Sequence, residues 1–260
     1  MKKNKTKEHQ AAILEQFTRQ AVPFSQQQAH SQEAFLNLLL EMSAVGPADD
    51  VLDVACGPGL VATALAAKAR HVTGIDLTPA MIARAQEIQQ EKGLTNLTWQ
   101  TGNVLPLPFP DASFALVVSR YSFHHFLDPK AVLVEMVRVC RPGGRVLLAD
   151  VTMAPEKRDF FDREEKLRDP THTRTLTPEE FLHMAAEVQL KEIKSQFSKS
   201  ERNLEAHLQA SFPNPGDEEK IRKLFREDIG QDALGLGAQR RGKEIYFAYP
   251  IIILVGQKGS

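Results

Sequence analysis

The segment Val51–Gly59, which reads VLDVACGPG, decides the fold of this chain. Its first five residues are typical of a buried β-strand, and the glycines that follow are typical of a sharp turn from a strand into a helix. The next strand-like run, His71–Asp76, ends in an acidic residue roughly 20 residues further on, as dinucleotide-type folds require. Together the two segments predict a parallel sheet with a cofactor-binding loop after its first strand.

Outward from this segment, short strand-like runs alternate with longer helical runs as far as Asp150. This alternation predicts an α/β fold in which helices cover a mostly parallel sheet. Two expected helices begin with an N-cap residue followed by proline, at Thr78 and at Asp128. The expected strands are Val51–Ala55, His71–Asp76, Leu97–Gln100, Phe114–Val118 and Arg145–Asp150.

The ends of this pattern divide the chain into three parts. Residues 1–48 are expected to form an N-terminal helical cap, and residues 49–152 the cofactor-binding Rossmann-like core. Residues 153–260 are expected to supply lid helices and C-terminal strands that complete the same domain. Within them, Met153–Leu176 is charged and lacks a clear strand pattern, so we expect it to be a helical lid over the sheet.

The remaining C-terminal elements follow from shorter signals. Thr177–Glu180 is a capping box that predicts the start of a helix. Leu190–Phe197 alternates like a strand, and Ile245–Gln257 is expected to be the last strand. Because Pro250 has no N–H to donate to a ladder, we expect a bulge or a short break there.

Composition excludes several classes of protein. The 260 residues hold 32 Lys+Arg against 33 Asp+Glu, which argues against nucleic-acid binding through bulk positive charge. Two cysteines cannot form a disulfide framework or a four-cysteine zinc site, and the scattered histidines do not predict a metal site. No apolar run approaches about 20 residues, and the start lacks the apolar stretch of a signal peptide, so we expect no membrane partner and a cytoplasmic location. Oligomeric state stays open.

The glycine loop alone allows two cofactors. Gly57, Gly59 and Ala62 satisfy the loose form of the nicotinamide fingerprint, in which alanine replaces the third glycine. An NAD(P)-dependent oxidoreductase is therefore one possible interpretation.

Two residues of the loop favour a cofactor without phosphate. Pro58 removes one backbone N–H that would otherwise cradle a pyrophosphate. Asp53 places a carboxylate where it would repel a diphosphate and attract an ammonium group. S-adenosylmethionine carries an ammonium and a sulfonium cation and no phosphate. Asp76 could accept hydrogen bonds from the ribose of either cofactor and so does not discriminate.

With these features in place, the sequence resembles the class I S-adenosylmethionine-dependent methyltransferases, close to the ubiquinone/menaquinone C-methyltransferase type. The expected fold is then a Rossmann-like three-layer sandwich with a mostly parallel seven-stranded sheet and an antiparallel last strand. The matching stretches are Val51–Gly59, Gly74–Thr78 with Met81, Gly102–Phe109, Phe114–Ser119, His124–Phe126 and Arg141–Arg145.

The resemblance implies S-adenosylmethionine as cofactor and assigns positions to bind it. An acid would hold the amino group, glycines would let the backbone approach, a second acid would bind the ribose, and apolar side chains would enclose the adenine. Family members usually have Asp where this chain has Asn103, although an amide oxygen still accepts from an exocyclic amine. The cofactor-binding positions are Asp53, Gly57, Gly59, Asp76, Leu77, Met81, Asn103, Val104, Ser119 and Tyr121.

His124 is the candidate catalytic base, with His125, Tyr121 and His172 behind it. Methyl transfer from a sulfonium expels a neutral leaving group, so a base is needed only if the acceptor must lose a proton. Adjacent histidines at a strand-to-helix turn more often orient the loop, and we favour that structural role.

Segments outside the core are candidates to close the pocket. Phe17, Phe24 and His30 could do so from the N-terminal helix. In the lid, His172 and Arg174 could bind a polar or acidic acceptor, although Arg174 is more simply explained by pairing with Glu164 or Glu165 at the surface.

The sequence thus favours an enzyme that moves a methyl group from S-adenosylmethionine to a small organic acceptor by in-line displacement. The alternatives are an NAD(P)-dependent oxidoreductase and a non-catalytic S-adenosylmethionine-binding protein. The acceptor, and whether its O, N, C or S atom is methylated, cannot be read from the residues.

Overall fold

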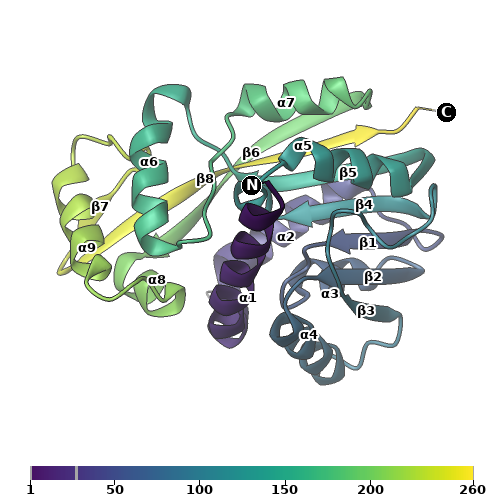
Figure 1. Ribbon diagram of the computed structural model, residues 1–260, viewed down its shortest axis with the longest axis horizontal. Helices are drawn as coiled ribbons and strands as arrows, with labels where there is room; N and C mark the ends of the chain where they lie inside the picture. Colours follow the sequence, from purple (N-terminus) through teal and green to yellow (C-terminus); the bar gives the residue numbers. More distant parts are fainter. Residues whose placement is uncertain (1, 27–28, 260) are drawn as a thin grey trace.

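The computed structural model describes residues 2–26 and 29–259, which form one mixed sheet between layers of helices (Figure 1). Seven strands form a continuous path in the order β3-β2-β1-β4-β5-β8-β6. The first five strands are parallel, β8 is antiparallel to β5 and β6 is antiparallel to β8. Their bounds are β1 Asp50–Val54, β2 His71–Asp76, β3 Leu97–Thr101, β4 Phe114–Arg120, β5 Cys140–Val151, β6 Lys191–Asn203 and β8 Glu244–Gln257.

The Rossmann-like class and the antiparallel last strand are confirmed. The sheet also contains a short strand that we did not expect, β7 (Gln239–Arg241), which pairs with β8. The strand order reverses between β1 and β4. Loops at the carboxyl ends of strands diverge at such a reversal, so it opens a crevice that can hold a ligand.

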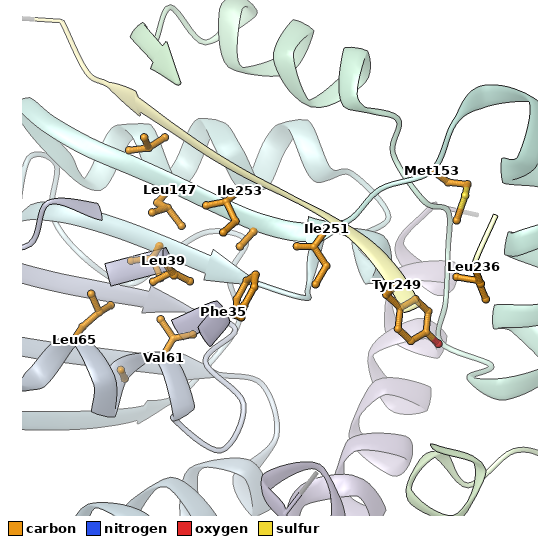
Figure 2. Close-up of a cluster of buried hydrophobic side chains, with 14 of the residues drawn as sticks. Phe35, Leu39, Val61, Leu65, Leu147, Met153, Leu236, Tyr249, Ile251 and Ile253 are labelled. Atoms are coloured by element: carbon orange, nitrogen blue, oxygen red, sulfur yellow. The ribbon is translucent and has the colours of Figure 1, made fainter. Parts of the chain in front are cut away.

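Helices cover both faces of the sheet. The bounds of the five that pack directly on it are α2 Ala29–Ser43, α3 Leu60–Ala66, α4 Pro79–Glu91, α5 Pro129–Val139 and α7 Pro178–Glu187. The first three lie on one face, and α5 and α7 lie on the other. Alternating residues of each central strand therefore enter different cores, as Ile251 and Ile252 do in β8. Figure 2 shows the first of these cores, in which Phe35 and Leu39 of α2 meet Ile253.

The helices beyond the core extend around one end of the sheet. They are α1 (Lys2–Gln26), α6 (Pro155–Arg168), α8 (Leu204–Ser211) and α9 (Asp217–Asp228), with the one-turn helix η1 (Phe123–His125) after β4. In Figure 1, α1 crosses in front of the sheet, and it packs against α4 and α8. Among the described residues, no helix combines the length and the apolar character needed to cross a membrane.

Several sequence expectations need adjustment. Only residues 155–168 of the expected lid are helical, and the following segment to Leu176 is a loop tied to η1, where Thr173 donates from its N–H to the His124 carbonyl at 2.9 Å. The strand β6 continues to Asn203, six residues beyond Phe197 (203 − 197). These differences matter because both the loop after α6 and the added end of β6 reach the cavity described below.

The expected bulge or break at Pro250 is wrong, since β8 runs unbroken through it. The Pro250 carbonyl accepts from the Thr152 N–H at 3.0 Å. The N–H and carbonyl of a β-residue point to the same neighbour, so the nitrogen of Pro250 faces the end of β5 and not β6. The missing donor therefore costs no hydrogen bond to β6.

Candidate active site

The loop after β1 is folded tightly over Trp99 of β3. Gly59 has φ +77°, and a Cβ added there would lie 2.4 Å from the indole ring and 3.0 Å from the Ala85 methyl. Gly74 of β2 is equally restricted, because a Cβ there would lie 2.5 Å from the same ring. The second glycine of the sequence motif is therefore required by what lies beneath the loop, as well as by its backbone conformation.

The loop offers no N–H from residues 57–59 to a phosphate. The Gly57 N–H donates to Asp76 Oδ2 at 2.9 Å, Pro58 has none, and the Gly59 N–H donates to the Cys56 carbonyl at 3.0 Å. Phosphate-binding glycine loops use these groups as donors to the ligand. The geometry thus agrees with the sequence argument against a diphosphate cofactor.

Asp76 is held by two backbone N–H groups. Gly57 donates to Oδ2, and Thr78 donates to Oδ1 at 2.8 Å. Each carboxylate oxygen keeps lone pairs for a further donor. Burial raises the pKa of Asp76, against the lowering effect of these N–H groups. A pair of adjacent hydroxyl groups is the kind of ligand that such a fixed carboxylate can accept.

Asp53 lies behind the loop, at the start of α3. Its side chain is buried, and its Oδ2 accepts from the Ala62 N–H at 3.0 Å. Burial raises the pKa of Asp53 to about 8, although the Ala62 N–H and the positive charge of Arg120 act in the opposite direction. Asp53 is therefore a carboxyl group that an approaching cation would ionise.

One cavity of about 350 Å³ brings most of the expected residues together. It runs from the loop after β1 to Tyr249 of β8, beneath α1. The expected residues that line it are Asp53, Gly57, Asp76, Leu77, Met81, Asn103, Val104, Tyr121 and His124.

Gly59 and Ser119 are expected site residues that do not line this cavity. Gly59 allows the loop to rest closely on the Trp99 ring, as described above. The Ser119 hydroxyl donates to the Val54 carbonyl at 2.7 Å and lies 2.6 Å from the Ser122 hydroxyl. It therefore ties β4 to β1 and positions the turn that follows. Asn103 lines the cavity, but its Oδ1 accepts from the Leu105 N–H at 3.1 Å.

His124 is fixed by Asp150 at the end of β5. The His124 Nδ1 lies 2.6 Å from Asp150 Oδ1, while Asp150 Oδ2 accepts from the N–H groups of Ser122 and Phe123 at 3.0 and 2.7 Å. Burial opposes a charge on His124, but the negative charge and hydrogen bond of Asp150 outweigh it and raise the His124 pKa. This bond assigns the proton to Nδ1 and leaves Nε2 as the basic nitrogen.

His125 has the opposite protonation behaviour. Burial and the neighbouring charge of His124 lower its pKa to about 3, so it is neutral. Thr171 Oγ1 donates to Asp169 Oδ1 at 2.6 Å, so the 3.0 Å contact between Thr171 Oγ1 and His125 Nδ1 requires the proton on the ring nitrogen. The His125 carbonyl lies 2.7 Å from His9 Nε2. His125 therefore joins η1, the loop after α6, and α1.

The other half of the cavity is lined by residues that the sequence analysis did not identify. Glu165 and Arg168 of α6 form a buried ion pair, and burial of Glu165 is outweighed by Arg168, which lowers the Glu165 pKa. The Tyr249 hydroxyl lies 2.6 Å from Glu165 Oε1 and 2.9 Å from His207 Nε2. Arg202 of β6 completes this polar wall. No local motif marks these residues, because α6, β6, α8 and β8 are separated in sequence and meet only in the folded chain.

Of the residues expected to close the pocket from outside the core, Phe17 and His172 can be placed. Phe17 lines the cavity with its ring 5.1 Å from that of His125, and the side chains of Phe24 and His30 lie outside the part that the structure describes. His172 also lines it, with Nε2 2.8 Å from Asp162 Oδ1.

Arg174 pairs with Glu180, so its expected pairing with Glu164 or Glu165, which are both buried, is wrong. Within residues 2–26 and 29–259, no cluster of three or more potential metal ligands is found.

Comparison with known proteins agrees with this geometry. A model of the methyltransferase domain family matches residues 52–148. An uncharacterized methyltransferase, YcgJ of Bacillus subtilis (strain 168), is 33% identical over 177 residues, which are 67% of this chain and 70% of the relative. The crystal structure of YcgJ has a TM-score of 0.79 at 26% identity and covers 86% of this chain and 98% of its own.

A more distant structure shares the fold. Geranyl diphosphate C-methyltransferase from Streptomyces coelicolor A3(2), crystallised with geranyl diphosphate and S-adenosyl-L-homocysteine, has a TM-score of 0.60 at 16% identity and covers 87% of this chain and 78% of its own.

The chain belongs to the class I S-adenosylmethionine-dependent methyltransferases. It is an enzyme of that family, and the family's cofactor is S-adenosylmethionine, which confirms the cofactor prediction and decides against the nicotinamide alternative. The donor set fits this cofactor, because two carboxylates without a phosphate-binding N–H suit a ribose diol and an ammonium group.

Proposed function

We propose that the enzyme transfers the methyl group of S-adenosylmethionine to a small organic acceptor bound between the loop after β1 and the polar wall of α6, β6 and β8. The observation that carries this proposal is the single cavity that joins Asp76 to Tyr249 beneath α1. A small molecule fits such a covered space, whereas a macromolecular acceptor would need an open surface.

The proposed cofactor contacts follow from the lining residues. Asp76 would accept hydrogen bonds from the ribose hydroxyls, and Leu77 with Met81 would enclose the adenine. Asn103 and Val104 would lie at its edge. Asp53 would attract the amino group through the loop or a water. When bound, the cofactor supplies a methyl group on a sulfonium whose departure needs no acid.

His124 is the proposed base for an acceptor that must lose a proton. Its Nε2 would take the proton, and Asp150 would stabilise the resulting imidazolium through Nδ1. Because the His124 pKa is raised above 6.5, the basic form is reached only at higher pH. Activity toward such an acceptor is therefore expected to rise as pH increases through the His124 pKa.

Aromatic side chains support a ring-shaped acceptor. Phe17, Tyr121, Phe161 and Tyr249 all line the cavity. Together with the resemblance to the ubiquinone/menaquinone C-methyltransferases, they favour methylation of a carbon on an aromatic or quinone-like ring. Mass spectrometry of the methylated product would distinguish carbon from oxygen methylation by its fragmentation.

Titration calorimetry with S-adenosylhomocysteine tests the proposed site. The unchanged protein should bind it, and Asp76→Ala should weaken binding by about tenfold or more, because it removes a charged acceptor of two hydroxyls. Asp111→Ala is the matched control, since Asp111 is exposed and pairs with Arg138 away from the cavity.

Two results would reject the proposal. One is saturable binding of NADH with no binding of S-adenosylhomocysteine. The other is cofactor binding without methyl transfer to any member of a broad panel of phenols, quinols and aromatic acids, which would favour the non-catalytic alternative.

A further inference from the structure

Within the described part of the chain, two arginines of the cavity have no carboxylate partner. Arg202 of β6 is only 7% exposed, and its side chain donates to the Glu201 carbonyl at 2.9 Å. Arg120, at the end of β4, has a buried Nε that finds no hydrogen-bond partner among the described residues. Among the residues that the structure describes, neither forms an ion pair, whereas the nearby Arg168 is matched by Glu165.

The two guanidinium groups act on the same region of the cavity. Burial lowers the pKa of Arg202, and the positive charges of Arg120 and Arg168 lower it further, against the nearby hydroxyl groups of Tyr121 and Tyr249. Like charges in a poorly solvated space repel one another, and a bound anion relieves the repulsion.

The surroundings of these arginines suit an anion. The Arg120 guanidinium lies over the ring of Tyr121, 4.2 Å from its centroid, and over Phe35 at 5.0 Å. The Tyr121 hydroxyl is buried and has no hydrogen-bond partner within residues 2–26 and 29–259, so it can donate to a ligand. Tyr121 has φ +55°, a conformation that is unusual for a bulky residue and is found most often at functional sites.

We propose that Arg202 and Arg120, with the Tyr121 hydroxyl, bind an acidic group of the methyl acceptor. This inference rests on the proposed function. A carboxylate and a phosphate both match the forked donors of arginine. The acceptor is then an acid, with its anionic group held near β6 and its reactive atom turned toward the loop after β1.

The methionine carboxylate of the cofactor is the other possible source of this anion. Arg202 argues for the acceptor, because its charged neighbours are the groups of β4, β8 and α6, and neither Asp53 nor Asp76 is among them. Arg120 lies between the two halves of the cavity, since its charge also acts on Asp53. The test must therefore separate the two sources.

The experiment uses protein saturated with S-adenosylhomocysteine and three probes: benzoate, phenyl phosphate and the neutral benzamide. Calorimetry should show that at least one of the two anions binds more tightly than benzamide. Arg202→Gln should weaken that anion by about 30-fold and leave benzamide unchanged, and Arg202→Lys should restore part of the loss. The matched control is Arg240→Gln, because Arg240 is exposed in β7 and does not line the cavity.

A second titration identifies the source of the anion. Arg202→Gln is titrated with S-adenosylhomocysteine and with 5′-methylthioadenosine, which lacks the carboxylate. Unchanged affinity for both supports the acceptor. Loss of affinity for S-adenosylhomocysteine alone overturns the proposal, because the anion then belongs to the cofactor. Equal binding of benzamide and both anions by a cofactor-saturated protein also overturns it while leaving the proposed function intact. Failure of the unchanged protein to bind S-adenosylhomocysteine rejects the proposed function itself.

Discussion

Asp53 and Asp76 are two buried carboxyl groups with different tasks around one loop. Asp76 holds the loop directly through the Gly57 N–H, whereas Asp53 supports the start of α3 through Ala62. Both were predicted from the sequence, because the loop, its strand and the following acidic residue lie within 26 consecutive residues (51–76). The local structure of such a short segment is set mainly by its own residues, so its function can be predicted with little knowledge of long-range contacts.

The pH dependence of cofactor binding should report on Asp53. Its pKa of about 8 without ligand exceeds that of an ordinary carboxyl, so near pH 6 the group is protonated and must release its proton when it meets a cationic amino group. Affinity for S-adenosylhomocysteine should therefore rise from pH 6 to pH 8, by up to about tenfold per unit, and then level off.

Calorimetry across this pH range measures the effect. Asp53→Asn should remove most of the slope, because the amide still accepts from the Ala62 N–H but cannot ionise. An equal slope in the unchanged protein and in Asp53→Asn would show that another group titrates.

At the scale of single elements, α7 shows how a local signal holds without help from the rest of the fold. The Thr177 hydroxyl accepts from the Glu180 N–H at 3.2 Å, and Glu180 Oε2 accepts from the Thr177 N–H at 2.9 Å, so the predicted capping box is confirmed. By contrast, the end of β6 was missed, because its pairing partner β8 lies more than 40 residues further along the chain.

Removing this cap should cost measurable stability. Thr177→Ala leaves the Glu180 N–H of a buried helix end without its acceptor, and the free energy of unfolding should fall by about 1 kcal/mol. Urea unfolding measures this loss, provided that the slope of the unfolding free energy against urea concentration is unchanged. Ser195→Ala, at an exposed position of β6, is the control and should change stability little. A loss equal to that of the control would mean that the cap contributes nothing.

At the scale of the whole molecule, the site is closed by a helix far from it in sequence. Gln16 and Gln20 of α1 both donate to the Ser211 carbonyl, at 2.7 and 3.0 Å, and His9 reaches the His125 carbonyl. Ser25, near the other end of α1, accepts from Arg84 Nε of α4 at 3.0 Å. Such a helix can open to admit a ligand and close over it.

The release rate of S-adenosylhomocysteine should depend on these contacts. The double variant Gln16→Ala and Gln20→Ala removes both bonds to Ser211 and should speed release several-fold, as measured by stopped-flow displacement. Glu15→Ala, on the exposed side of α1, is the control. Identical release rates in the double variant and in the control would argue against α1 as a lid.

The polar wall of α6, β6 and β8 could not be predicted from sequence. Arg202 lies opposite Phe247 in the pairing of β6 with β8, and Tyr249 lies opposite Ser200. A shift of one residue in this register would turn each side chain to the other face of the sheet. The charge and ring chemistry of the wall thus depend on a long-range alignment that no local pattern expresses.

Trp99 is the sole tryptophan of the chain, and it lies directly under Gly59, with its indole N–H donating to Gln89 at 2.6 Å. The chain therefore carries a fluorophore directly beneath the glycine loop after β1. Because the indole ring touches the loop, we expect its fluorescence to change when a ligand shifts that loop, without any added label.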